Sequence, residues 1–254
     1  MITDNIRDPD KRHCIRCGNL ISVSSRFCNS CGSNQFGGDL TIVENKWIRT
    51  KQAGLFYAII IILCASANFI DSFQTLGWSL FFEAALAMIS ISFFAYNWTE
   101  NKKLLAWPDF SFQKFCAYCA LAITGSVIVQ FAVGWLNVTF YSRQQENLTD
   151  LKGNILGELL LVFFIAVTPA VFEELGFRGY LLQNLLKVAD AQQALFITSF
   201  LFAIIHMSFI SLFWLIPFAL LLGYVRLKEN TLWYGVFMHF FFNFTACMFM
   251  LSGL

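Results

Sequence analysis

The chain has 254 residues, of which 57% are hydrophobic and 13% are charged, whereas a typical soluble domain is about 45–50% apolar and about 25% charged. Thirteen of the charged residues fall within residues 1–53, so the remainder is too apolar for a soluble globule, and its apolar runs are long enough to span a bilayer. This distribution excludes a soluble enzyme, a secreted disulfide scaffold and a disordered chain, and the net charge of +1 gives no reason to expect a nucleic-acid partner. The polar first residues lack the apolar core of a cleavable signal peptide, so we expect none.

Two Cys-x-x-Cys-Gly motifs dominate residues 1–35. Cys14 and Cys17 form the first motif and Cys28 and Cys31 the second, with ten residues between them. Because Zn²⁺ prefers four soft ligands in a tetrahedron, this spacing predicts a structural Cys₄ zinc ribbon with no open coordination position, which folds only with its metal. Two disulfides are the alternative interpretation, and they would require an oxidising compartment.

The next segment, residues 36–53, contains a Gly-Gly pair and several basic residues, and we expect it to be a flexible linker. Residues 54–254 then predict an all-α polytopic membrane domain with about seven transmembrane helices. The expected spans are residues 54–71, 76–98, 113–141, 154–178, 192–208, 211–227 and 231–252.

The orientation of these spans is predicted by the Lys and Arg residues of the short loops, which favour the cytoplasmic side. A cytoplasmic zinc ribbon puts seven of these residues inside and two outside. The inside residues are Lys102, Lys103, Lys114, Arg178, Lys187, Arg226 and Lys228, and the outside residues are Arg143 and Lys152. We therefore expect a multi-pass protein of the cell (inner) membrane, with the bilayer as its partner, a cytoplasmic N-terminus and a C-terminus outside.

Ionisable side chains within the spans are concentrated in the last 100 residues. Glu174 and Arg178 are four residues apart, so they share one face of a helix and can pair, while Glu173 points about 100° away. Such groups are costly inside a membrane, and they usually face the interior of a bundle or a hydrated cavity.

Two later spans contribute the other polar side chains. His206 lies at the end of the fifth span, and His239 and Asn243 lie four residues apart in the seventh. A glutamate can take a proton from water, a histidine can share that task, and a histidine with an amide can stabilise an oxyanion, so the set suits hydrolysis.

Each of these residues also has a purely structural interpretation. Glu174 and Arg178 alone could form a salt bridge between helices that only supports the site. Glu83 and Glu158 also fall in spans, and we interpret both as structural carboxylates.

The three motifs in this order resemble those of the CPBP (CAAX protease and bacteriocin-processing, or Abi) family of intramembrane endopeptidases, which includes the type II CAAX prenyl proteases. The motifs are Glu173-Glu174-x-x-x-Arg178, Phe202-x-x-x-His206 and His239-x-x-x-Asn243, and the resemblance covers roughly residues 150–250. It implies an α-helical bundle with a catalytic cavity inside the membrane. By position, Glu173 and His206 would activate water, His239 and Asn243 would stabilise the oxyanion, and Glu174 and Arg178 would support the first motif.

The leading hypothesis for the function is an intramembrane endopeptidase that cleaves a membrane-associated peptide or protein on or within the cytoplasmic half of the bilayer. The family has been described both as metalloproteases and as glutamate-dependent proteases. The sequence lacks His-Glu-x-x-His, which excludes a zincin site, but leaves a catalytic metal open. A non-catalytic protein that sequesters a peptide or confers bacteriocin immunity is one alternative, and a proton-coupled transporter is another.

Overall fold

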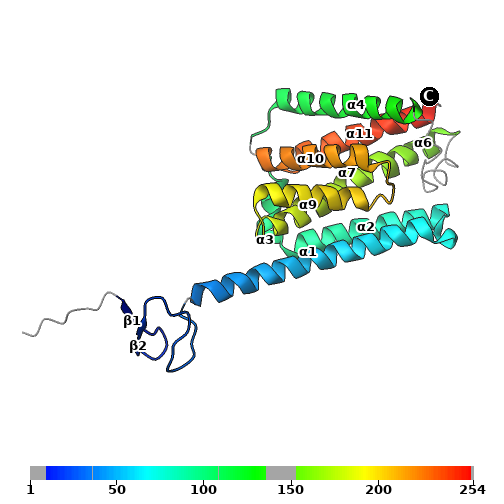
Figure 1. The fold of residues 1–254 in the computed structure, drawn as a ribbon. Coiled ribbons are helices and arrows are strands. Elements are labelled where there is room, and N and C mark those ends of the chain that lie inside the picture. The colour runs from blue at the N-terminus through cyan, green and yellow to red at the C-terminus, as the bar shows by residue number, and fades with distance from the viewer. Residues whose placement is uncertain (1–9, 36, 108, 136–152, 253–254) are drawn as a thin grey trace, which may run out of the picture. The chain divides into compact units, whose positions relative to one another are not determined.

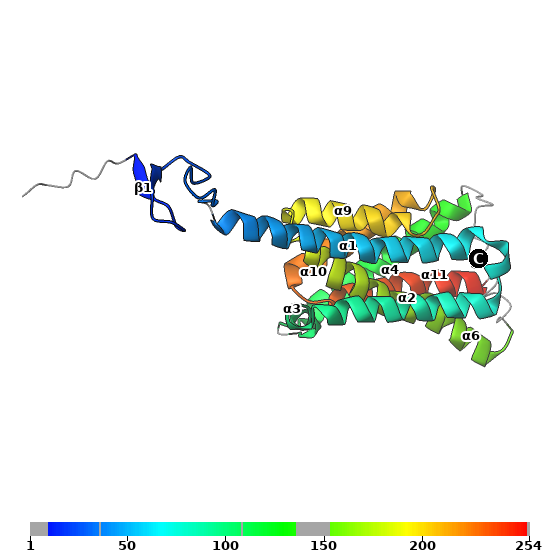
Figure 2. The ribbon, with the colours of Figure 1, turned by 90° about the horizontal axis from the view of Figure 1, so that it is seen from below.

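A computed structural model describes residues 10–35, 37–107, 109–135 and 153–252 (Figures 1 and 2). It divides into two compact units, Met1–Ile48 and Arg49–Leu254, and each is considered by itself below.

The first unit contains a two-stranded antiparallel sheet of β1 (Lys11–His13) and β2 (Leu20–Ser22). Each Cys-x-x-Cys turn ends at a glycine with a positive φ, +76° at Gly18 and +69° at Gly32, a conformation that side chains with a Cβ rarely adopt. Three buried residues form its apolar cluster, namely Cys14, Ile21 and Cys28. Because so small a cluster buries little apolar surface, the unit depends on a cross-link or metal for its stability.

The second unit is a bundle of roughly parallel and antiparallel helices (Figures 1 and 2). Its longer helices are the part of α1 (Gly37–Phe69) that begins at Arg49, and α2 (Leu76–Tyr96), α4 (Phe112–Trp135), α9 (Ala191–Ile204), α10 (Leu212–Glu229) and α11 (Trp233–Ser252). The short elements are η1 (Asp71–Phe73), α3 (Trp98–Asn101) and η2 (Lys102–Leu105). Between α4 and α9 runs one continuous helical stretch of α6 (Ile155–Val162), η3 (Phe163–Val167), α7 (Thr168–Glu173), η4 (Glu174–Leu181) and α8 (Leu182–Leu185).

The all-α polytopic class predicted from the sequence is confirmed. Within the described residues, five helical stretches are long and apolar enough to cross a membrane. They are Asn45–Phe69, Leu76–Tyr96, Phe112–Ala132, Ile155–Leu185 and Trp233–Ser252. The expected fifth span corresponds to α9, which has only 14 residues, and the sixth to α10, whose last turn carries Arg226, Lys228 and Glu229. Residues 136–141 of the expected third span lie outside the described residues.

The flexible linker expected at residues 36–53 differs from the structure. Residues 37–53 are helical and continue without a break into the first span, so α1 begins 17 residues earlier than the apolar run at residue 54. At the bundle's edge Arg49 donates to Asn184 Oδ1 at 3.1 Å and to Glu100 Oε1 at 2.8 Å. The helix therefore belongs to the membrane unit from Arg49 onward.

The bundle has two ends. We call one the Arg49 end, where Lys114 also pairs with Glu229 at 2.7 Å. The other, the Asn68 end, holds the turn between α1 and α2, and the C-terminus lies there as well (Figures 1 and 2). The long stretch 155–185 packs closely on α2, and Gly179 permits this approach because a Cβ at that position would lie 2.7 Å from the ring of Phe94.

Candidate functional site

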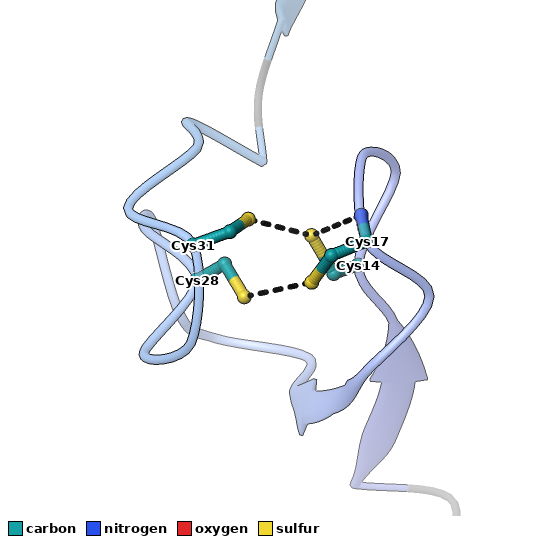
Figure 3. Close-up of side chains that lie close together, drawn as sticks. All are labelled: Cys14, Cys17, Cys28 and Cys31. Atoms are coloured by element: carbon teal, nitrogen blue, oxygen red, sulfur yellow. Dashed lines mark hydrogen bonds between the residues drawn. The ribbon is translucent and has the colours of Figure 1, made fainter.

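The four predicted cysteines of the first unit converge on one point (Figure 3). All their sulfurs lie within 4.8 Å of one another, with Cys14 3.7 Å from Cys31 and Cys17 3.6 Å from Cys28. A tetrahedral ZnS₄ centre with bonds of about 2.3 Å would separate its sulfurs by about 3.8 Å, so the spacing fits such a metal. All eight cysteines are free thiols, and the disulfide alternative is not supported.

Polar neighbours stabilise the thiolate form that a metal needs. Ser33 Oγ lies 3.3 Å from Cys14 Sγ, and the buried Gln35 donates its Nε2 to the same sulfur at 3.2 Å. The contact with Ser33, together with the amide N–H groups of Cys17 and Arg16, lowers the pKa of Cys14 to about 5. At Cys14 these donors therefore favour the thiolate, which is the form that binds a metal.

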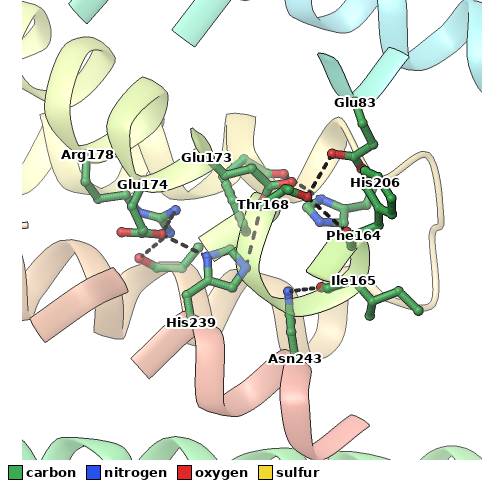
Figure 4. A network of polar contacts seen from close by, with 12 residues as sticks. Glu83, Phe164, Ile165, Thr168, Glu173, Glu174, Arg178, His206, His239 and Asn243 are labelled. Carbon is green, nitrogen blue, oxygen red and sulfur yellow. Dashed lines mark hydrogen bonds and ion pairs between the residues drawn. The ribbon is translucent and has the colours of Figure 1, made fainter. Parts of the chain in front are cut away.

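The six motif residues of the second unit come together around a single region (Figure 4). They come from the continuous stretch 155–185, the turn that follows α9 and the middle of α11. A cavity of about 390 Å³ is lined by Glu173, His206, His239 and Asn243, while Glu174 and Arg178 lie behind it and are fully buried.

Glu174 is the centre of a buried ion-pair network. Its Oε1 accepts from Arg178 Nη1 at 2.7 Å and from His239 Nδ1 at 3.1 Å. Arg178 also donates to the carbonyl of Ala219 at 3.3 Å. Gly235 on α11 permits this approach, since a Cβ there would lie 3.0 Å from Glu174 Oε2. The predicted i, i+4 pair is thus present, and it also orients a catalytic candidate on another helix.

The hydrogen bond to Glu174 fixes a proton on Nδ1 of His239. A carboxylate paired with arginine can only accept, so the Nδ1 of His239 carries a proton. Its Nε2 then points toward Glu173, whose Oε2 lies 3.8 Å away. The rings of Phe202 and Phe218 pack against the imidazole, with centroids at 5.9 and 5.7 Å, and hold it in this orientation.

His206 is fixed in a similar way by the backbone. Its Nδ1 lies 2.9 Å from the carbonyl oxygen of Phe202, one turn earlier, so Nδ1 is the donor. The other nitrogen, Nε2, is then available to the cavity that His206 lines. Among the described residues, Glu173 forms no ion pair with His206; its nearest basic nitrogen is that of His239.

Asn243 is positioned by a gap in the backbone hydrogen bonds of the facing helix. Pro169 has no N–H, so it cannot bond to the carbonyl of Ile165 four residues earlier. That carbonyl instead accepts Asn243 Nδ2 at 3.1 Å. The amide group keeps a second N–H, and its side chain lines the cavity.

Two stretches of π-helix flank α7, the helix that ends at Glu173. The first, η3, precedes α7, and the second, η4, follows it and begins at Glu174. Wider turns of this kind recur at functional sites, because they change which side chains face a neighbouring helix. The sequence pattern gave no sign of them.

Glu83 on α2 is the functional candidate that sequence reasoning assigned to structure alone. It lines the same cavity, and its Oε2 accepts from Thr168 Oγ1 at 3.2 Å (Figure 4). Glu158, the other carboxylate considered structural, is exposed on α6 and does not line the cavity. The polar lining beyond Glu83 includes Asn68 and Ser79, so the cavity extends from the motif residues toward the Asn68 end.

Comparison with known proteins identifies this part of the chain. Residues 155–245 match the family model described as "Rce1-like: Type II CAAX prenyl endopeptidase Rce1-like", and all six motif residues fall within the match. No curated protein and no solved structure matches the chain. Residues 155–245, which hold all three motifs, are thus similar to the type II CAAX prenyl endopeptidases, and this match supports the resemblance to the CPBP family.

Proposed function

We propose that this protein is an intramembrane endopeptidase that hydrolyses a peptide bond in a membrane-associated peptide or protein. The observation that carries the proposal is the convergence on one cavity of four residues of the matched segment 155–245, namely Glu173, His206, His239 and Asn243. A packing role explains buried polar residues singly, but it does not explain why all four line the same space.

Glu173 is the general base in this mechanism. Water is held between its carboxylate and Nε2 of His206, which accepts a hydrogen bond because Nδ1 already donates to Phe202. As the water oxygen attacks the substrate carbonyl carbon, Glu173 takes the proton and later gives it to the leaving amine. The products are a carboxylic acid and an amine, and no acyl-enzyme forms.

His239 and Asn243 stabilise the oxyanion. The two ring nitrogens of His239 face carboxylate oxygens, Nδ1 that of Glu174 at 3.1 Å and Nε2 that of Glu173 at 3.8 Å, an arrangement that favours a proton on each nitrogen. Its Nε2–H and the second N–H of Asn243 are then donors to the developing charge. Glu174 is a positioning residue, comparable to the carboxylate that orients a catalytic histidine in other hydrolases.

We propose that this chemistry does not need a metal. The donor atoms support this view, because Glu174 Oε1 is already shared by Arg178 and His239, and His206 Nδ1 is bonded to the backbone. Among the side chains that the structure describes, only the four cysteines of the first unit form a convergent group of three or more His, Cys, Asp or Glu ligands. Metal analysis and a chelator assay on a chain that lacks the ribbon test this directly.

The metal of the first unit is proposed to be a structural Zn²⁺. Four thiolates at tetrahedral spacing are the preferred zinc ligands, and they leave no position for a substrate or water. Removal of the Zn²⁺ should unfold the first unit, because the apolar cluster of this unit is so small.

Arg178 and Arg226 are buried in the bundle, but the other five Lys and Arg residues expected inside still outnumber the two expected outside, which supports an Arg49 end that faces the cytoplasm. The cavity extends toward the opposite end, at Asn68 and Ser79, so we now expect cleavage in the outer half of the membrane and not in the cytoplasmic half. A reporter fused after Leu254 should be found in the periplasm or outside the cell. A cytoplasmic reporter would place the cleavage site in the cytoplasmic half of the membrane instead.

The function is tested by proteomic comparison of membrane fractions that contain wild-type protein or the Glu173→Ala variant. An endopeptidase predicts new peptide termini that appear only with wild type, and these name substrates. A protein that only sequesters peptides, or a transporter, predicts the same termini in both samples, which would refute the proposal.

A further inference from the structure

The cavity contains a carboxylate that the three motifs do not include. Glu83 belongs to α2, outside residues 155–245, and it lies beside the motif residues (Figure 4). Thr168 Oγ1 holds its Oε2 at 3.2 Å and also lies 3.1 Å from the carbonyl of Phe164. This contact fixes Glu83 to the same helix that carries Glu173.

The separation between the two carboxylates is set by α7. Thr168 and Glu173 are its first and last residues, five positions apart, which corresponds to a rise of about 7.5 Å along a helix. An extended peptide advances about 3.3 Å per residue. With the scissile bond at Glu173, a substrate side chain two or three residues away would therefore lie beside Glu83.

The cavity lining holds two carboxylates and no permanent cation. The carboxylates are Glu83 and Glu173, the bases are His206 and His239, and no Lys or Arg is found among the described residues that line it. Arg178 is engaged by Glu174 behind the cavity. A carboxylate in such apolar surroundings is stabilised by a proton or by a cation, and this lining supplies no permanent cation to Glu83.

We propose that Glu83 is a specificity-determining residue that binds a cationic side chain, Lys or Arg, of the substrate two or three residues from the scissile bond. Thr168 is a positioning residue that holds the carboxylate toward this group. The inference rests on the proposed endopeptidase function, and it adds the chemical class of the substrate.

The experiment is cleavage-site profiling with purified full-length protein and a peptide library, half of it with acetylated N-termini. Cleaved sequences are identified by mass spectrometry, and the sites found are then made as pairs of quenched fluorescent peptides that differ only in Lys or norleucine. The ratio of kcat/KM for each pair is measured in wild type, Glu83→Gln and Glu83→Lys. Glu158→Gln is the matched control, because Glu158 is an exposed membrane-domain glutamate outside the cavity.

Wild type should prefer Lys over norleucine at one position two or three residues from the cut. Glu83→Gln, which keeps an acceptor for Thr168, should reduce this ratio on the order of 30-fold, the lower end of the cost of truncating one partner of a buried charge pair. Glu83→Lys should favour acidic residues at that position, and Glu158→Gln should keep the wild-type ratio. If the cleaved peptides are enriched only in those with a free N-terminus, Glu83 binds a terminal ammonium, and the proposal that it binds a Lys or Arg side chain is overturned.

Two further outcomes separate this inference from the proposed function. Cleavage by wild type without preference for Lys or Arg, or an unchanged ratio in Glu83→Gln, would mean that Glu83 holds a proton and not a substrate cation. No cleavage by wild type of any library peptide would contradict the endopeptidase function itself.

Discussion

Replacing Arg178 by Met should destabilise the membrane unit strongly. The substitution removes the 2.7 Å ion pair with Glu174, the bond to the Ala219 carbonyl and the contact of the guanidinium with the Phe202 ring at 4.2 Å. Both partners of the pair are almost completely buried. Removing one partner of such a pair costs about 3–5 kcal/mol, which corresponds to a fall in Tm of roughly 6–20 °C for a domain of this size.

The assay is thermal unfolding of purified protein in detergent, in which the fraction of protein that remains monodisperse is measured at each temperature. Glu174→Gln combined with Arg178→Met should recover at least half of the lost Tm, since the amide oxygen can still accept from His239 while no charge is left unpaired. Lys187→Met is the control, because Lys187 is half-exposed and 3.9 Å from Glu100, and such surface pairs contribute under about 1 kcal/mol. A single variant as stable as wild type, or a double variant no better than the single one, would refute the buried-pair argument.

Three further predictions concern the approach to Glu174, the ribbon and its junction with the bundle. Gly235→Ala should lower stability by about 1–3 kcal/mol and reduce activity, because its Cβ would lie 3.0 Å from Glu174; an unchanged Tm in thermal unfolding would count against this. Cys14→Ser should lower bound zinc from one per chain to none without changing the Tm of the membrane unit, as elemental analysis and the same melts would check. A chain that starts at Asn45 should keep peptidase activity, whereas further loss of Arg49 should lower Tm, because only the second deletion removes the bonds to Glu100 and Asn184.

The parts of the site that follow from helix geometry could be predicted from the sequence. The four-residue spacing of Glu174 and Arg178 predicted their pairing, because side chains at that distance share a helix face. The contact of His239 with Glu174 joins residues 65 positions apart, and periodicity within one helix carries no information about it. Pro169 is a signal in the sequence for one further contact: its missing N–H predicts an open carbonyl at Ile165, although not that Asn243 binds it.

The fold was predictable where apolar runs coincide with helices, and less so where they do not. Hydropathy locates the stretch that crosses the hydrocarbon and not the ends of the helix, so the polar residues 37–53 were expected to form a flexible linker although they are helical. Glu83 was assigned to structure because a single carboxylate in a span has no partner visible in the sequence. Only the packing of α2 against the stretch 155–185 brings it to the cavity.

The central claim is that Glu173 acts as the general base, and the most direct test is the turnover of one cleaved peptide by purified wild type and Glu173→Gln. The account predicts a loss of about 10²–10⁴-fold in kcat with the Tm preserved, since the amide has nearly the same shape but cannot accept the proton of water. Glu158→Gln, which changes an exposed glutamate on α6, should retain wild-type turnover. A Glu173→Gln protein that cleaves the peptide at the wild-type rate would contradict the mechanism.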